Sequence, residues 1–82
     1  MHIVAAQSRA GRALLGWSQT ALAEAAGVNK RTVMDFESGA REPHLGTLSL
    51  VRSALEGAGV EFIGGGAYQG EGGPGVRLKG GV

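Results

Sequence analysis

The stretch QTALAEAAGVNKRTVMDFESG, which spans Gln19–Gly39, contains two helix-forming segments that meet at one glycine. The first segment is rich in alanine, the best helix former. Gly27 ends it, because glycine readily adopts the left-handed conformation that many helix ends need. Asn29 is a good N-cap, so a new helix is expected over residues 30–37. The stretch therefore predicts two short helices joined by a tight turn.

The side chains in this stretch are suited to close packing of its two helices. Ala23 is small at the point where the helices are expected to approach each other. A shared apolar face is expected from Leu22, Ala26, Val28, Val33 and Phe36. Two short helices packed across a glycine turn in this way form a helix-turn-helix motif.

Upstream of the motif, a first helix is expected over residues 3–15, with Gly16 as its stop. Steps of three and four residues predict its apolar face. That face consists of Ile3, Ala6, Ala10, Ala13 and Leu14. Ser18 is the expected cap of the second helix. Trp17 is expected to pack near the core against Leu22, as a hydrophobic staple, rather than to stack on a base.

Downstream of the motif, a fourth helix is expected over residues 45–56. The loop before it contains Pro43, which keeps the chain extended. His44 is a poor cap for this helix. The predicted buried residues are Leu45, Leu48, Val51 and Leu55.

Glycine divides the chain into a helix-rich body, residues 1–58, and a glycine-rich segment, residues 59–82. Period-two alternation in VEFI and GVRLK predicts two short strands in this segment. If the strands pair antiparallel, an apolar face forms from Val60, Phe62, Val76 and Leu78. Glu61 then shares the opposite face with Arg77 and Lys79.

The arrangement of the glycine-rich segment has more than one interpretation. Its glycine content favours a disordered tail, whereas its alternation favours an ordered hairpin. An isolated two-stranded hairpin is marginally stable, so its apolar face is expected to need a partner. That partner is either the fourth helix or a second hairpin, paired edge to edge across a two-fold axis. The second arrangement makes the segment a candidate dimerisation element.

The run WSQTALAEAAGVNKRTVMDFESGAREP, followed by LGTLSLVRSAL, resembles the XRE/Cro-like (phage-repressor type) helix-turn-helix proteins. The resemblance extends over about residues 9–55. It implies a compact bundle of four or five helices whose third helix enters the DNA major groove. With the two predicted strands, the expected fold class is a mainly α, repressor-like bundle with a short C-terminal β-hairpin.

Candidate base-contacting residues lie at and after the start of the third helix. They are Asn29, Lys30, Arg31, Thr32 and Asp35. The resemblance assigns base-reading positions to these residues, Thr32 excepted. In the major groove, lysine and arginine donate to guanine, and asparagine pairs with adenine. Asp35 has three interpretations, because its carboxylate is able to accept from a cytosine amino group, to repel phosphate or to have only a local role within the helix.

The resemblance also implies contacts with the DNA backbone. The candidate phosphate-contacting residues are Gln19, Ser18, Ser38 and Arg41. Gln19 matches a family position at the N-terminus of the second helix, where the helix terminus also favours an anion. Arg12 and Glu37 match a family ion pair between the first and third helices, and a structural role is expected for them.

The composition argues against several other classes of protein. The 82 residues contain no cysteine and two histidines, so neither a disulfide nor a metal site is expected. No nucleophile–base pair, paired carboxylates or GK[ST] phosphate loop is recognisable, so neither an enzyme nor a bound cofactor is expected. No apolar run approaches the roughly 20 residues of a membrane span. No signal peptide is recognisable either, so a cytoplasmic protein is expected.

These observations predict a small bacterial-type transcriptional regulator that binds double-stranded DNA in a sequence-specific way. It is expected to act as a homodimer and as a repressor. Because the net charge is only +1, the positive charge for DNA must be concentrated locally. The alternative is an antitoxin or another protein-interaction module, which binds a partner protein and its own operator. The low net charge and the glycine-rich segment favour this alternative.

Overall fold

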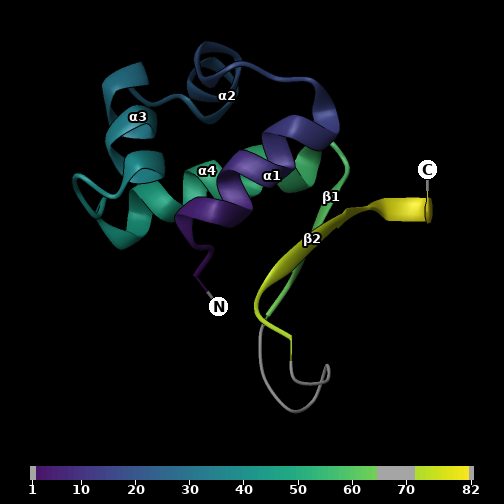
Figure 1. The fold of residues 1–82 in the computed structure, drawn as a ribbon. Helices are drawn as coiled ribbons and strands as arrows, with labels where there is room; N and C mark the ends of the chain where they lie inside the picture. The colour runs from purple at the N-terminus through teal and green to yellow at the C-terminus, as the bar shows by residue number, and fades with distance from the viewer. Residues whose placement is uncertain (1, 65–71, 82) are drawn as a thin grey trace.

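The computed structural model describes residues 2–64 and 72–81, and it contains a helical bundle followed by a β-hairpin (Figure 1). The helices are α1 (Ala5–Leu15), α2 (Gln19–Ala26), α3 (Lys30–Ser38) and α4 (Leu45–Gly57). The strands are β1 (Val60–Ile63) and β2 (Gly75–Leu78), and a short 3-10 turn, Lys79–Gly81, follows them. The predicted mainly α fold with a C-terminal hairpin is confirmed.

The turn between α2 and α3 depends on the backbone of Gly27, which has φ 70° and ψ 31°. In this conformation the Gly27 amide donates to the carbonyl of Glu24, and the Val28 amide donates to the carbonyl of Ala23 at 3.0 Å. This pair of bonds is the Schellman motif, which satisfies the last carbonyls of a helix. The predicted role of Gly27 as a helix stop is therefore confirmed.

The core lies among the four helices and extends to the first residue of β1. Its buried apolar residues are Ile3, Leu22, Ala23, Ala26, Val33, Phe36, Leu48, Val51, Leu55 and Val60. They include the predicted shared face of α2 and α3, with Val28 partly buried beside it. Trp17 is also partly buried against the core, as predicted. Full burial of a leucine such as Leu55 contributes about 2 kcal/mol.

The predicted buried face of α1 is wrong. Ala6, Ala10 and Ala13 are exposed, and Leu14 retains 42% of its accessible surface. Ile3 is buried, but it precedes the helix. The buried residues of α1 are Gln7, Ser8 and Gly11.

Each buried residue of α1 has a specific partner in another segment. The spacing of apolar residues along the helix does not reveal these partners. The Gln7 amide donates to the carbonyls of Ile63 at 3.1 Å and Gly75 at 3.0 Å, so it joins both strands to the helix. Its Oε1 accepts from the backbone N–H of Val4 at 2.9 Å. At Gly11, a Cβ would lie 3.5 Å from Leu55 side-chain atoms, so even a methyl group would contact α4 there. Polar bonds and close approach therefore set the orientation of α1.

The structure also corrects the predicted burial on α4. Leu48, Val51 and Leu55 are buried as predicted, but Leu45 is 62% exposed. Each step of three residues turns the helix by about 60°, so Leu45 lies roughly 120° around the axis from Val51. It therefore lies outside the buried face.

The hairpin has the predicted strand pairing. Val60 lies opposite Leu78, and Phe62 lies opposite Val76. These four side chains pack against the core, where the hairpin contacts both α1 and α4. Glu61 and Arg77 lie opposite each other and form an ion pair. Lys79 begins the 3-10 turn, so the prediction that it continues the strand is wrong.

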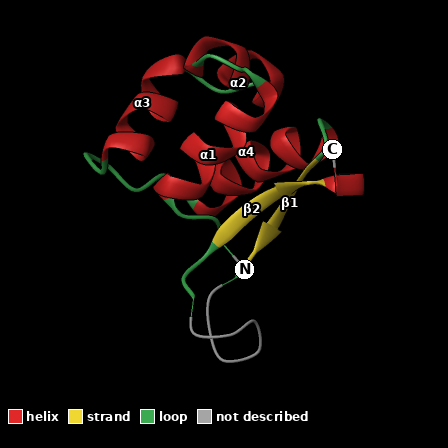
Figure 2. Ribbon diagram, turned by 45° about the vertical axis from the view of Figure 1, so that its right-hand side comes forward, coloured by secondary structure: helices red, strands yellow, loops and turns green. Residues whose placement is uncertain are grey.

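Formation of the strands contradicts the disordered-tail interpretation for residues 60–63 and 75–78. Residues 65–71, in the glycine-rich connection, lie outside the described residues. In both views the hairpin is on the side of the bundle away from α2 and α3 (Figures 1 and 2). The helix-turn-helix and the hairpin thus lie on opposite sides of the molecule.

Candidate nucleic-acid interface

The two helices of the motif each begin with a side-chain cap. The Ser18 hydroxyl accepts from the backbone N–H of Ala21 at 3.0 Å. The Asn29 side-chain carbonyl accepts from the backbone N–H of Arg31 at 2.7 Å. Each cap satisfies one of the N–H groups that a helix start leaves without an intrahelical partner. The remaining N–H groups of each first turn lie at the positive end of the helix dipole.

The candidate base-contacting residues differ in exposure. Asn29, Lys30 and Arg31 are exposed, while Thr32 and Asp35 are half-buried. The side chain of Arg31 retains 76% of its accessible surface. The first turn of α3 thus presents two cations to solvent. Contact of these residues with bases stays a prediction.

The cap at Asn29 restricts what this side chain offers to DNA. A bidentate pair with adenine uses both the carbonyl oxygen and the amide nitrogen of asparagine. Here the oxygen already accepts from Arg31, so adenine would compete with the helix cap. The Asn29 amide nitrogen is the part of the side chain that can donate without disturbing the cap.

Arg31 is held by the residue one turn further along α3. Its Nε lies 3.1 Å from Asp35 Oδ1 in an ion pair. These residues, with Thr32, Arg41 and Pro43, line a surface depression of about 120 Å³. The chain after α3 is brought there because the Arg41 amide donates to the Asp35 carbonyl at 3.2 Å. Arg31 and Arg41 therefore border one concave surface. The sequence did not predict that these two residues lie close together.

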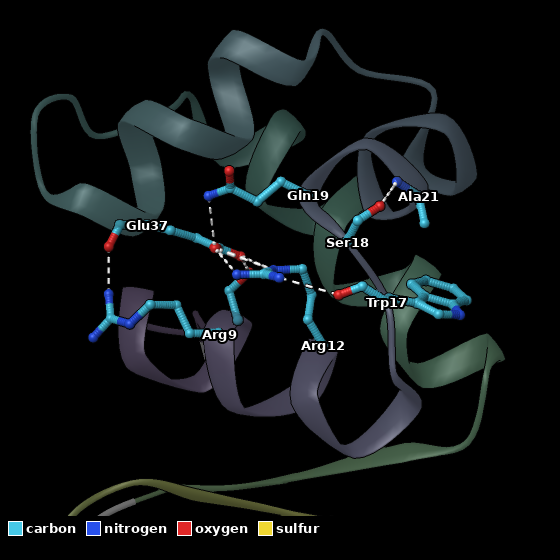
Figure 3. A network of polar contacts seen from close by, with 8 residues as sticks. Arg9, Arg12, Trp17, Ser18, Gln19, Ala21 and Glu37 are labelled. Atoms are coloured by element: carbon cyan, nitrogen blue, oxygen red, sulfur yellow. Dashed lines mark hydrogen bonds and ion pairs between the residues drawn. The ribbon is translucent and has the colours of Figure 1, made fainter.

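Behind this surface, Arg12 of α1 and Glu37 of α3 form an ion pair, and Arg12 Nη2 lies 2.7 Å from Glu37 Oε1. Arg12 Nε lies 3.1 and 2.9 Å from the two carboxylate oxygens. Arg12 also donates to the Trp17 carbonyl at 3.1 Å (Figure 3). One guanidinium thus joins α1 to α3 and to the segment before α2.

Two further side chains donate to the Glu37 carboxylate. The Ser8 hydroxyl lies 2.6 Å from Oε2, and Gln19 Nε2 lies 3.2 Å from Oε1. The Glu37 side chain is only 2% exposed, so this network is inside the protein. Gln19 points from the start of α2 toward Glu37, which ties the candidate phosphate contact to the core (Figure 3).

The hydrogen bonds to Glu37 determine its protonation state. Burial alone would raise the pKa of Glu37, but the hydrogen bonds from Arg12, Ser8 and Gln19 outweigh burial. The pKa of Glu37 therefore lies below its ordinary value of 4.5. The hydrogen bond from Arg12 to Glu37 raises the pKa of Arg12 in turn. Both groups are charged at neutral pH.

The remaining candidate backbone contacts lie at the end of α3. The Ser38 hydroxyl donates to the Asp35 carbonyl and accepts from the Ala40 amide, both at 3.3 Å. Ser38 and Arg41 are both exposed. Their contact with phosphate stays a prediction, as does that of Ser18 and Gln19.

Sequence reasoning missed two residues that help to place α3. Ser8 bonds the Glu37 carboxylate, and Arg9 Nη1 donates to the Glu37 backbone carbonyl. A signal for Ser8 was present, because residues four apart share a helix face and Ser8 lies four residues before Arg12. No comparable signal identifies Arg9, since its partner is a backbone atom.

A comparison with protein-family models matches residues 9–61 to the helix-turn-helix family. The chain belongs to the XRE/Cro-like helix-turn-helix family. This membership makes it a DNA-binding protein of the transcription-regulator type, and the family is not typically enzymatic. A comparison with curated proteins finds no match.

Among the described residues of this helix-turn-helix protein, neither a membrane-spanning helix nor a metal-binding cluster is found. Across residues 2–64 and 72–81, no helix has both the length and the apolar content needed to cross a bilayer. Over the same two ranges, no three side chains among His, Cys, Asp and Glu gather into a group that could hold a metal ion.

Proposed function

We propose that this helix-turn-helix protein binds double-stranded DNA in a sequence-specific way and represses transcription by occupying an operator. The exposed first turn of α3, with Lys30 and Arg31 beside the capped helix start, carries the proposal. An α-helix fits the major groove of B-DNA, and its N-terminal side chains meet the base edges. The two cations supply the donors that guanine accepts.

The residues around α3 fit contacts with the DNA backbone. The capped N-terminus of α2 offers N–H groups and a positive dipole end to a phosphate, next to Ser18 and Gln19. Ser38 and Arg41 lie beyond the other end of α3. Phosphate contacts on both sides of a recognition helix fix its register on the duplex.

A homodimer is the proposed DNA-binding form. A helix of nine residues such as α3 is about 13 Å long and spans only a few base pairs. Two copies reading half-sites about 34 Å apart would recognise a longer sequence. We assign the hairpin as the dimerisation element, because each strand of the two-stranded sheet has an edge that no other strand of the described residues pairs with. Binding to a partner protein stays a prediction from the sequence.

Selection of bound duplexes from a randomised library, followed by gel shifts on the best sequence, tests the proposal. Arg31→Ala should cost roughly 1–3 kcal/mol on the selected sequence and relax specificity. Gln19→Ala should weaken binding to selected and random DNA more evenly. Arg52→Ala is the matched control, because it removes the same charge and an ion pair of the same i,i+4 spacing from α4, outside the proposed DNA contacts. Equal losses in Arg31→Ala and Arg52→Ala would contradict the proposal.

A truncation tests the dimer separately. Removal of residues 64–82 deletes β2 and should convert a dimer to a monomer, as measured by light scattering. A mass that still corresponds to two copies of the shortened chain would rule out the hairpin as the dimerisation element.

A further inference from the structure

We propose that Asp35 is a positioning residue, which holds Arg31 so that it reads a guanine and keeps it from binding phosphate. This inference rests on the proposed function and concerns the ion pair between Arg31 Nε and Asp35 Oδ1 at 3.1 Å. It assigns the base preference to Arg31, and it gives Asp35 a role other than direct contact with a base.

The ion pair holds the guanidinium by one edge. Its partner on Asp35 faces Nε, and in the part of the chain that the structure describes no other group bonds this guanidinium. The two terminal nitrogens of Arg31 therefore have no partner among the described residues, and they belong to a side chain that is 76% exposed. Two parallel N–H groups are what guanine O6 and N7 accept in a bidentate contact.

Helix stability does not account for the pair. An acidic residue stabilises a helix best when it precedes its basic partner, whereas here Arg31 precedes Asp35 by four residues. Exposed ion pairs of this kind contribute little to folding. Asp35 is nonetheless only 26% exposed, so its side chain lies much closer to the protein surface than the arginine with which it pairs. A half-buried carboxylate can restrict a long side chain that would otherwise sample many rotamers.

The depression beside the pair gives the carboxylate a second effect. Arg31 and Arg41 line this concave surface from two segments of the chain, and Asp35 lies on it with them. Without Asp35, two cations would face a DNA backbone and bind any sequence. The carboxylate offsets one of these charges and repels phosphate. Specificity is a difference of affinities, so weaker binding to random DNA raises it even where the guanine contact is unchanged.

Two substitutions of Asp35 distinguish this role from packing. Asp35→Asn keeps the size of the side chain and removes its charge, whereas Asp35→Glu keeps the charge and changes the size. If Asp35 acts through its charge, Asp35→Glu should retain the guanine preference and Asp35→Asn should lose it. A residue with only a packing role would show the opposite order.

The experiment is duplex selection with the full chain, followed by affinity measurements on the selected duplex, on a duplex with one guanine replaced, and on random duplex. In the wild type, replacing that guanine should weaken binding by roughly 5- to 140-fold. Arg31→Ala should abolish this ratio, and Asp35→Asn should reduce it several-fold. Asp35→Asn should also bind random DNA more tightly. The slope of log affinity against log salt concentration should become steeper by about 1.

Each other outcome counts against the inference. If Asp35→Asn keeps the wild-type ratio, Asp35 does not position Arg31. If Asp35→Asn changes the preference at a different base pair and leaves the guanine intact, then Asp35 reads a base itself. If the selected duplex depends on no residue of the α3 start, or the wild type has no sequence preference, the proposed function fails together with the inference. Thermal melts of all variants should agree closely, because an ion pair with an exposed arginine contributes little to folding.

Discussion

Helix α1 is joined to two parts of the molecule by buried polar side chains, and the two attachments use different chemistry. Toward α3, Arg12 and Ser8 bond the carboxylate of Glu37, a residue that is 3% exposed. Toward the hairpin, the neutral amide of Gln7, a residue that is 2% exposed, donates to one carbonyl on each strand. The charged attachment is on the side of the proposed DNA surface, and the neutral one is on the side of the proposed dimerisation element.

The two sides of α1 require different kinds of attachment. Ion pairs and charged hydrogen bonds are directional and costly to break inside a protein. They suit α3, whose angle to α2 must be fixed if it is to enter a groove. An amide that bonds two carbonyls fixes the position of a hairpin without placing a charge beside its apolar face. Substitutions in the two attachments should therefore differ in how much they lower the free energy of unfolding and in how much of the protein they affect.

The largest effect is expected from Glu37→Gln. This change keeps the size of the side chain but leaves Arg12 partly buried without its counterion. The free energy of unfolding should fall by about 3 kcal/mol, because removal of one partner leaves an uncompensated charge. Urea denaturation measures the loss. Glu24→Gln, at an exposed position of α2, is the control and should stay within about 0.5 kcal/mol of the wild type.

A smaller loss is expected from Gln7→Leu, about 2 kcal/mol, because two strand carbonyls lose a donor. The effect should be local. Hydrogen exchange should accelerate more at the amides of β1 and β2 than at those of α3. If α3 loses as much protection as the hairpin, then the two attachments of α1 are not independent.

Gly27→Ala should cost about 1 kcal/mol, because alanine is strained at a φ of 70°. Gly46→Ala is a matched change near the start of α4, where a Cβ would meet no described atom of another segment within 4 Å. It should stabilise the protein by roughly 0.5 kcal/mol, since alanine favours a helix. Thermal unfolding should therefore shift in opposite directions. Two shifts of the same sign would contradict the role given to the turn.

Acid acts on the charged attachment through Glu37. The folded-state pKa of Glu37 is lowered, so its contribution to stability is fully present above the ordinary value of 4.5 and is lost as the pH falls below it toward the folded pKa. Stability of the wild type should therefore decline in this acidic range. Glu37→Gln should lack this part of the decline when unfolding is followed from about pH 7 to about pH 3. A parallel decline in both proteins would assign it to other carboxylates.

The sequence predicted the motif and the shared apolar face of the hairpin because apolar residues carry both patterns. Leu22, Val33 and Phe36 recur at helical spacing, and Val60 and Phe62 alternate as strand residues do. Local periodicity is then enough to identify the buried face.

The buried face of α1 was not predictable in the same way. Its alanines form an apolar stripe that is exposed, whereas its buried polar side chains bond groups 29 to 68 residues away. For Gln7 nothing in the helix itself shows that such partners exist, whereas Ser8 lies on the same helix face as Arg12. The pairing of Arg31 with Asp35 was likewise missed, although their spacing of four residues was visible.

The two carbonyls that Gln7 binds lie 56 and 68 residues after it in the chain. On the ribosome, α1 emerges before either acceptor has been synthesised. Its buried amide therefore lacks its strand partners until β2 has left the exit tunnel, and a nascent chain that ends before Gly75 presents an unfinished helix face. The bonded state of α1 consequently requires that the chain has been made through Gly75.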